Sequence, residues 1–156
     1  MERVHEALAP ALRYPVFLQG RAPKRALIEG FVRETPAVLF GTSSFWEGVD
    51  VPGDPLRLVL IDRLPFASPQ DPVVAARLER LERRGQSPFA TYQVPQAILR
   101  LKQAFGRLVR TRTDSGLVVI CDRRLLERRY GKRFLRALPP ARRLSHHDEL
   151  VSFKRA

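Results

Sequence analysis

The chain has 156 residues, of which 44% are hydrophobic, so it can bury a core and is not a disordered tail. Lysine and arginine outnumber aspartate and glutamate by 28 to 16, and the excess lies almost wholly in residues 100–143, which indicates a local face for a polyanion. The single cysteine excludes an intrachain disulfide, and no apolar run is long enough for a membrane span, so we expect a cytoplasmic protein with no membrane partner.

Apolar runs alternate with helical patterns along most of the chain. Strands are expected at residues 14–19, 37–40, 56–61 and 117–121, and helices at residues 4–12, 23–35, 71–84, 95–110 and 125–138, with a loop at residues 85–92 and a short strand within the tail at residues 150–153. The strands are continuously apolar, as in a buried parallel sheet. The sequence therefore predicts an α/β fold, a parallel sheet with helices on both faces, whose ligands lie beyond the carboxyl ends of the strands.

The segment that follows the second expected strand is suited to binding phosphate. Gly41 allows the backbone to turn after the strand. Thr42, Ser43 and Ser44 then bring hydroxyl and backbone N–H groups to the start of a helix. We therefore regard these three hydroxyl residues as candidate phosphate contacts.

Acidic and aromatic residues of the same segment have competing interpretations. Glu47 stands three residues after Ser44, which is the spacing of a helix capping box as well as that of a functional carboxylate. Asp50 could accept a hydrogen bond from a ribose hydroxyl, hold an arginine, or be a plain turn residue. Phe45 and Trp46 are better explained as core residues than as platforms for stacking bases.

Residues 96–110 carry an apolar and a basic stripe on opposite sides of a helix. The apolar stripe begins just before this segment and comprises Val94, Ile98, Leu101, Phe105 and Leu108. The basic side is a polar stripe that comprises Gln96, Arg100, Gln103, Arg107 and Arg110. The polar stripe spans about 80° and has no acidic residue, and arginine offers a fork of donors for phosphate oxygens. Gly106 lies beside it, which suggests that something approaches the backbone closely. An ordinary amphipathic helix with a basic solvent side remains an alternative.

Other candidates have plainer explanations. The arginines of residues 123–133 could line a nucleic-acid path or simply cover a solvated helix. His146 and His147 lack the further ligands that a metal requires, so no metal site is expected. Cys121, on an apolar strand, is expected to be buried.

Two of these segments together resemble a known family. Residues 41–50, Gly-Thr-Ser-Ser-Phe-Trp-Glu-Gly-Val-Asp, resemble motif V of superfamily 2 DNA helicases of the XPD/DinG type. Residues 103–110, Gln-Ala-Phe-Gly-Arg-Leu-Val-Arg, resemble motif VI of the same helicases. Residues 62–66, 114–122 and 130–139 are also similar to the family, so the resemblance covers residues 16–140.

The resemblance implies the second RecA-like lobe of a motor, a P-loop NTPase-like fold in which ATP with Mg²⁺ lies between two lobes. It assigns Arg107 and Arg110 as catalytic arginine fingers that reach the γ-phosphate. It implies ATP-binding roles for Gln103, Glu47, Gly48 and Asp50, and nucleic-acid contacts for Thr42, Ser43, Ser44, Arg63 and Arg100.

The chain departs from a complete motor. No phosphate-binding Walker A loop is present, because the sole Gly-Lys pair, Gly131 and Lys132, is followed by Arg133. We therefore expect residues 1–140 to be an N-terminally truncated helicase lobe and residues 141–156 to be a basic and polar tail. The missing first lobe, in the same full-length chain or in a split subunit, would hold most of the ATP and Mg²⁺.

The expected function is that of the C-terminal motor lobe of a nucleoid-associated, ATP-dependent DNA helicase. It would supply arginine fingers and part of a single-stranded DNA track, and it would not hydrolyse ATP without the Walker-containing lobe. A non-catalytic nucleic-acid-binding module derived from a helicase lobe is the alternative, and a basic interaction domain unrelated to nucleic acid is a third.

Overall fold

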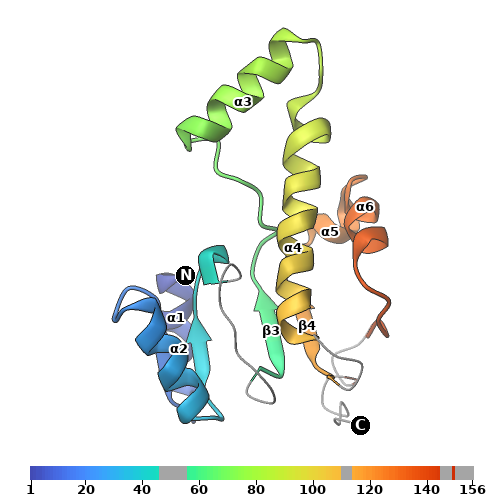
Figure 1. Ribbon diagram of the computed structural model, residues 1–156. Coiled ribbons are helices and arrows are strands. Elements are labelled where there is room, and N and C mark those ends of the chain that lie inside the picture. Colours follow the sequence, from blue (N-terminus) through green and yellow to red (C-terminus); the bar gives the residue numbers. More distant parts are fainter. Residues whose placement is uncertain (46–55, 110–113, 145–148, 150–156) are drawn as a thin grey trace. The chain divides into compact units, whose positions relative to one another are not determined.

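The computed structural model describes residues 1–45, 56–109, 114–144 and 149, so the strand expected at residues 150–153 lies outside the described residues. The chain divides into two compact units, Met1–Arg57 and Leu58–Ala156 (Figure 1). Among the described residues, each unit contains one pair of parallel strands. The α/β class with parallel strands is therefore confirmed.

The first unit is built around two short parallel strands. Its elements are α1 (Glu2–Leu8), the 3₁₀ turn η1 (Ala9–Ala11), β1 (Val16–Leu18), α2 (Lys24–Arg33), β2 (Val38–Phe40) and the 3₁₀ turn η2 (Ser43–Phe45). Strands β1 and β2 pair in register from Val16 with Val38 to Leu18 with Phe40. The carboxyl ends of both strands therefore meet at one edge.

The core of the first unit forms where α2 covers these strands. Leu27 and Phe31 on α2 are buried together with Phe45. Phe17 and Leu39, from the two strands, pack against this cluster. The interpretation of Phe45 as a core residue is thus confirmed, whereas Trp46 lies outside the described residues.

The second unit contains the long helix α4 and the other strand pair. Its elements are β3 (Leu58–Ile61), α3 (Pro72–Arg83), the π-helical turn η3 (Phe89–Gln93), α4 (Val94–Leu108), β4 (Leu117–Ile120), α5 (Arg124–Glu127) and α6 (Gly131–Ala137). Strands β3 and β4 pair in parallel from Leu58 with Leu117 to Ile61 with Ile120. Helix α4 packs against both β3 and α6.

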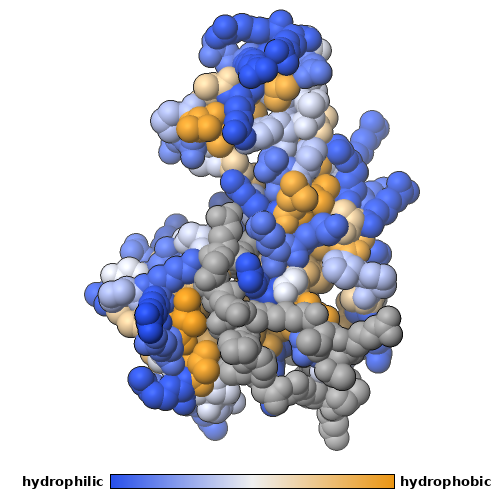
Figure 2. Space-filling model, viewed as in Figure 1, coloured by the Kyte–Doolittle hydropathy of each residue, from blue (hydrophilic) through white to orange (hydrophobic). Residues whose placement is uncertain are grey.

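Helix α3 begins as its sequence predicts. The Asp71 carboxylate accepts hydrogen bonds from the backbone N–H groups of Val73 and Val74, at 2.9 and 3.1 Å, and Pro72 occupies the first turn. Figure 2 shows a largely hydrophilic surface over this helix, in line with its charged exposed side. Val74 is its one buried residue.

The buried face of α4 is rotated from the predicted stripe. Val94, Leu101 and Leu108 are buried as expected, but the remaining buried positions are Ala97 and Ala104. Ile98 and Phe105, which the hydrophobic pattern placed in the core, are only half-buried. Consequently the described residues of the polar stripe, Gln96, Arg100, Gln103 and Arg107, lie toward the flank of the helix rather than directly opposite the core.

Three predictions about the second unit are wrong in detail. Residues 89–93 form a π-helical turn that runs into α4, where a loop was expected. The helix expected at residues 125–138 is two helices, because Arg128 has an extended backbone and Gly131 packs so tightly on α5 that a Cβ there would overlap the Leu125 carbonyl. Cys121 is exposed rather than buried, since β4 ends at Ile120.

Candidate functional site

Polar side chains gather where β1 and β2 end. Thr42, Ser43 and Ser44, the three hydroxyl residues predicted to contact nucleic acid, follow β2 and are all exposed. The backbone N–H and the hydroxyl of Thr42 lie 2.7 and 3.0 Å from Oε1 of Gln19, which directly follows β1. The predicted ligand-binding edge of parallel strands therefore carries a connected set of hydroxyl and amide groups in this unit.

Two residues of this edge were missed by the sequence analysis. Gln19 contacts Thr42 and Ser44 through its side-chain amide. Lys24, in the first turn of α2, donates from Nζ to the carbonyl oxygen of Ser44 at 2.7 Å and lies 5.2 Å from the centre of the Phe45 ring. The available signal was that Gln19 is the residue at the carboxyl end of an expected strand.

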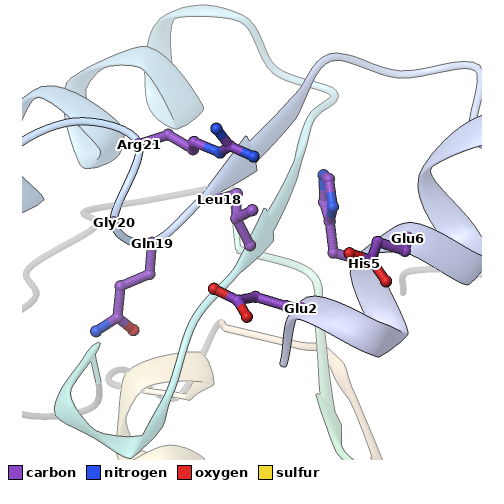
Figure 3. A pocket seen from close by; sticks show the side chains of 7 residues that line it. All are labelled: Glu2, His5, Glu6, Leu18, Gln19, Gly20 and Arg21. Atoms are coloured by element: carbon purple, nitrogen blue, oxygen red, sulfur yellow. The ribbon is translucent and has the colours of Figure 1, made fainter.

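A hollow of about 430 Å³ lies beside this edge. Figure 3 shows its lining residues, Glu2, His5, Glu6, Leu18, Gln19, Gly20 and Arg21. Two carboxylates in the lining, from Glu2 and Glu6, repel phosphate. This hollow is therefore a poor candidate for a site that binds nucleotide or the DNA backbone.

In the second unit, α4 places Gln103 and Arg107 one turn apart. Residues four apart on an α-helix lie on the same face, and here Gln103 is exposed and Arg107 half-buried. A Cβ built on Gly106 would meet no atom within 4 Å among the described residues. The protein segments described here therefore leave the backbone next to this pair open.

The arginines predicted to contact nucleic acid differ in their surroundings. Arg63, in the loop after β3, has a side chain that is 83% exposed and lies 3.8 Å from the carboxylate of Asp62. Arg100 on α4 is half-buried, and its Nη1 donates to the carbonyl oxygen of Pro65 at 3.4 Å. Arg63 thus presents its charge to solvent, whereas Arg100 also contacts the loop that carries Arg63.

Asp122, just past β4, is a buried charged residue that the sequence analysis did not single out. Its carboxylate accepts a hydrogen bond from the backbone N–H of Leu64 at 2.8 Å and forms an ion pair with Arg124 at 2.6 Å. The hydrogen bonds from Arg124 lower the pKa of Asp122 to about 2, against the opposing effect of burial. This carboxylate stays ionised at neutral pH and ties the loop after β3 to the end of β4.

Arg124 also links this ion pair to aromatic rings. Its guanidinium lies 5.4 Å from the centre of the Phe66 ring. Phe66 stacks on Phe89 at 5.6 Å, and Tyr130 and Phe134 pack edge-on to Phe66. Phe66, in the loop that follows β3, is therefore held in place by the Arg124 guanidinium and by three aromatic rings.

Four predicted site residues lie outside the described residues. They are Glu47, Gly48, Asp50 and Arg110. Their predicted roles in ATP binding and catalysis stay predictions.

The part of the chain that the structure describes contains neither a metal-ligand cluster nor a membrane-spanning helix. Within residues 1–45, 56–109, 114–144 and 149, no group of three or more histidine, cysteine, aspartate or glutamate side chains is arranged to hold a metal ion. In the same residues, every helix is too short or too polar to cross a bilayer.

Comparison with known proteins gives a consistent result. The family model described as "Helicase C-terminal domain" matches residues 1–141. The chain is 50% identical over 153 residues to the ATP-dependent DNA helicase YoaA of Escherichia coli (strain K12). The aligned residues make up 98% of this chain and 24% of that protein. The chain is 47% identical over 136 residues to the ATP-dependent helicase DinG of Mycobacterium tuberculosis (strain ATCC 25618 / H37Rv), covering 86% of this chain and 20% of that protein.

Another relative extends the same pattern. The 3'-5' exonuclease DinG of Bacillus subtilis (strain 168) is 45% identical over 122 residues, covering 78% of this chain and 13% of that protein. The chain thus spans about a quarter or less of the length of these relatives. The family resemblance predicted from residues 41–50 and 103–110 is confirmed, and the chain belongs to the XPD/DinG-type family of helicase C-terminal domains.

Proposed function

We propose that the chain acts as the second motor lobe of an ATP-dependent DNA helicase, supplying arginine fingers to ATP and part of the track for single-stranded DNA. The observation that carries the proposal is the pairing of Gln103 and Arg107 on one face of α4, in a chain of this family. The relatives named as ATP-dependent helicases support the nucleotide and the DNA as ligands.

The chemistry of α4 fits a triphosphate. Arg107 carries a permanent positive charge on a planar fork of donors, and Gln103 adds amide groups one turn earlier. Bound ATP would supply the phosphoryl group that is transferred to water. Arg107, together with Arg110, would stabilise the negative charge that develops on the oxygens of this phosphoryl group. Such arginines are worth roughly 10³- to 10⁵-fold in rate in related motors.

Other residues of this chain, together with the other lobe, would complete the nucleotide site. Glu47, Gly48 and Asp50 would complete the ATP contacts from this chain. Mg²⁺ would be held mainly by the other lobe. Arg107 therefore offers the sharpest test of ATP chemistry in this chain.

The DNA track would use hydroxyls and arginines. Residues 42–44 expose hydroxyl groups at the carboxyl ends of β1 and β2, and Arg63 exposes its guanidinium after β3. Arg100 would support the loop of Arg63 and add positive charge. Because phosphate contacts dominate binding to single strands, affinity should fall steeply as salt rises.

A chimera tests the motor. This chain would replace the matching region of the E. coli relative, and DNA-stimulated ATP hydrolysis would be measured with and without Arg107→Ala. We expect the chimera to hydrolyse ATP and Arg107→Ala to lower kcat at least 100-fold, with single-stranded DNA still bound.

Arg80→Ala is the matched control, because Arg80 is an exposed arginine on a different helix, α3. It should leave kcat within about twofold. An active chimera in which Arg107→Ala is no worse than Arg80→Ala would contradict the assignment. A chimera that binds DNA but never hydrolyses ATP would instead favour the non-catalytic nucleic-acid-binding module.

A further inference from the structure

The side-chain amide of Gln19 joins residues that lie more than 20 positions away in the sequence. Its Oε1 accepts from the backbone N–H of Thr42 at 2.7 Å and from the Thr42 hydroxyl at 3.0 Å. Its Nε2 donates to the Ser44 hydroxyl at 3.3 Å. Since a backbone N–H requires an acceptor, the contact with Thr42 fixes which end of the amide is the oxygen.

These contacts close a ring of hydrogen bonds. The Thr42 and Ser44 hydroxyl oxygens lie 2.9 Å apart. Each hydroxyl has a single proton, and that of Thr42 is directed to Gln19 Oε1, so Ser44 is the donor in the contact between them. The ring therefore runs from Gln19 Nε2 to Ser44, from Ser44 to Thr42, and from Thr42 back to Gln19 Oε1.

Thr42, Ser43 and Ser44 are equivalent candidates in the sequence, but the ring of hydrogen bonds distinguishes among them. A phosphate oxygen is an acceptor and requires a donor, but the hydroxyl protons of Thr42 and Ser44 are both used within the ring. Among the described residues, the exposed Ser43 hydroxyl makes no hydrogen bond. Ser43 is thus the hydroxyl of this turn that retains a proton to donate.

The backbone around Gln19 holds its side chain in place. The Gln19 N–H donates to the Phe40 carbonyl at 2.9 Å, which continues the pairing of β1 with β2. Gly20 follows with φ of 94°, a conformation that glycine adopts readily, and turns the chain away. Figure 3 shows the Gln19 side chain directed away from the Arg21 guanidinium.

We propose that Gln19 is a positioning residue for the DNA track, whose amide ring orients residues 42–44 so that the Ser43 hydroxyl donates to a phosphate of single-stranded DNA. This inference rests on the proposed function, which assigns these residues to DNA. Lys24, which donates to the Ser44 carbonyl, supports the same turn from α2.

The test measures the affinity of the chain for a fluorescently labelled oligothymidine by anisotropy at several salt concentrations. We expect Ser43→Ala to weaken binding roughly tenfold, since it removes a hydrogen bond to a charged group. Gln19→Met, which keeps the size of the side chain but breaks the ring, should weaken binding by a similar factor.

A double-mutant cycle separates positioning from general damage. If Gln19 acts through Ser43, then Gln19→Met with Ser43→Ala should bind no more weakly than the weaker single variant. Urea unfolding of each variant shows whether the fold is intact, and Thr91→Val, which removes an exposed hydroxyl from η3, is the control expected to change nothing.

The outcomes are distinct. The positioning role is overturned if Ser43→Ala leaves the affinity for oligothymidine unchanged. It is also overturned if the losses of affinity caused by Gln19→Met and by Ser43→Ala multiply in the double variant. Either result leaves the DNA track in place. A chain that shows no salt-dependent affinity for oligothymidine overturns the proposed track itself, and this inference with it.

Discussion

The carboxylate of Asp122 and the backbone N–H of Leu64 are joined by a hydrogen bond of 2.8 Å across 58 residues of sequence. Asp122 follows β4 and Leu64 follows β3, so this contact fastens together the loops that leave two paired parallel strands. Both residues are buried, at 9% and 3% exposure. A charged group that is nearly inaccessible stabilises a fold only while its hydrogen bonds are intact.

Replacing this carboxylate tests its contribution to stability. Asp122→Asn removes the negative charge that Arg124 pairs with and leaves an amide that cannot satisfy the same donors. We expect the free energy of unfolding to fall by about 2–4 kcal/mol, measured by urea denaturation. Asp62→Asn is the control, because the Asp62 side chain is 65% exposed, and it should change stability by less than about 0.5 kcal/mol. Equal effects of the two variants would rule out a special role for Asp122.

The lowered pKa of Asp122 predicts how stability depends on pH. Its pKa is about 2 in the folded protein and near the usual 3.8 when unfolded, so its ionisation favours the fold above pH 4. This contribution, on the order of 2 kcal/mol, should be lost as the pH falls from about 4 to 2. The difference in unfolding free energy between the unaltered chain and Asp122→Asn should therefore be constant from pH 7 to 5 and shrink below pH 4. A difference that already disappears near pH 6 would show that another group controls it.

Gly131 allows α6 to begin directly against α5. A Cβ at this position would overlap the backbone carbonyl of Leu125, and backbone cannot move aside as a side chain can. We expect Gly131→Ala to lower the free energy of unfolding by about 1–3 kcal/mol. Gly30→Ala is the informative comparison, because the nearest atoms to its Cβ would belong to the Phe17 side chain, 2.6 Å away, so the substitution should cost less. The opposite ranking in urea denaturation would contradict the tight packing of these two helices.

Cys121 should react with a thiol reagent in the folded protein. It is exposed at the end of β4, although its N–H still donates to the Ile61 carbonyl at 2.9 Å. We expect one thiol per chain to react with Ellman's reagent without denaturant. A Cys121→Ser variant should release no colour, and a reaction that requires urea would show that the thiol is shielded.

Local sequence patterns predicted most elements but not the contacts between them. The strands at residues 37–40 and 117–121 were recognisable because continuous apolar runs mark buried parallel strands. On α4 the pattern misjudged the buried face, because Ala97 and Ala104 add little hydrophobicity yet permit the closest packing. The Gln19 ring and the Asp122 contact bring together residues 23 to 58 positions apart, which no local periodicity encodes. The α5–α6 break depends on the space beside Gly131, which is likewise a property of packing.

Gly106 offers a test in which stability and activity should change in opposite directions. Glycine in the middle of a helix costs about 1 kcal/mol relative to alanine, and a Cβ at Gly106 would meet nothing within 4 Å among the described residues. Gly106→Ala should therefore raise the free energy of unfolding of the chain by up to about 1 kcal/mol.

In the active chimera, the same methyl group would stand beside Gln103 and Arg107, where the proposed nucleotide approaches α4. A displacement on the order of 1 Å costs up to about 100-fold in rate, so Gly106→Ala should lower DNA-stimulated ATP hydrolysis at least tenfold despite the greater stability. Lys102→Ala, at an exposed position of the same helix, controls for general effects and should keep full activity. A stabilised Gly106→Ala chimera with unchanged kcat and KM would mean that no ligand comes close to this part of α4, which would count against the nucleotide site as well.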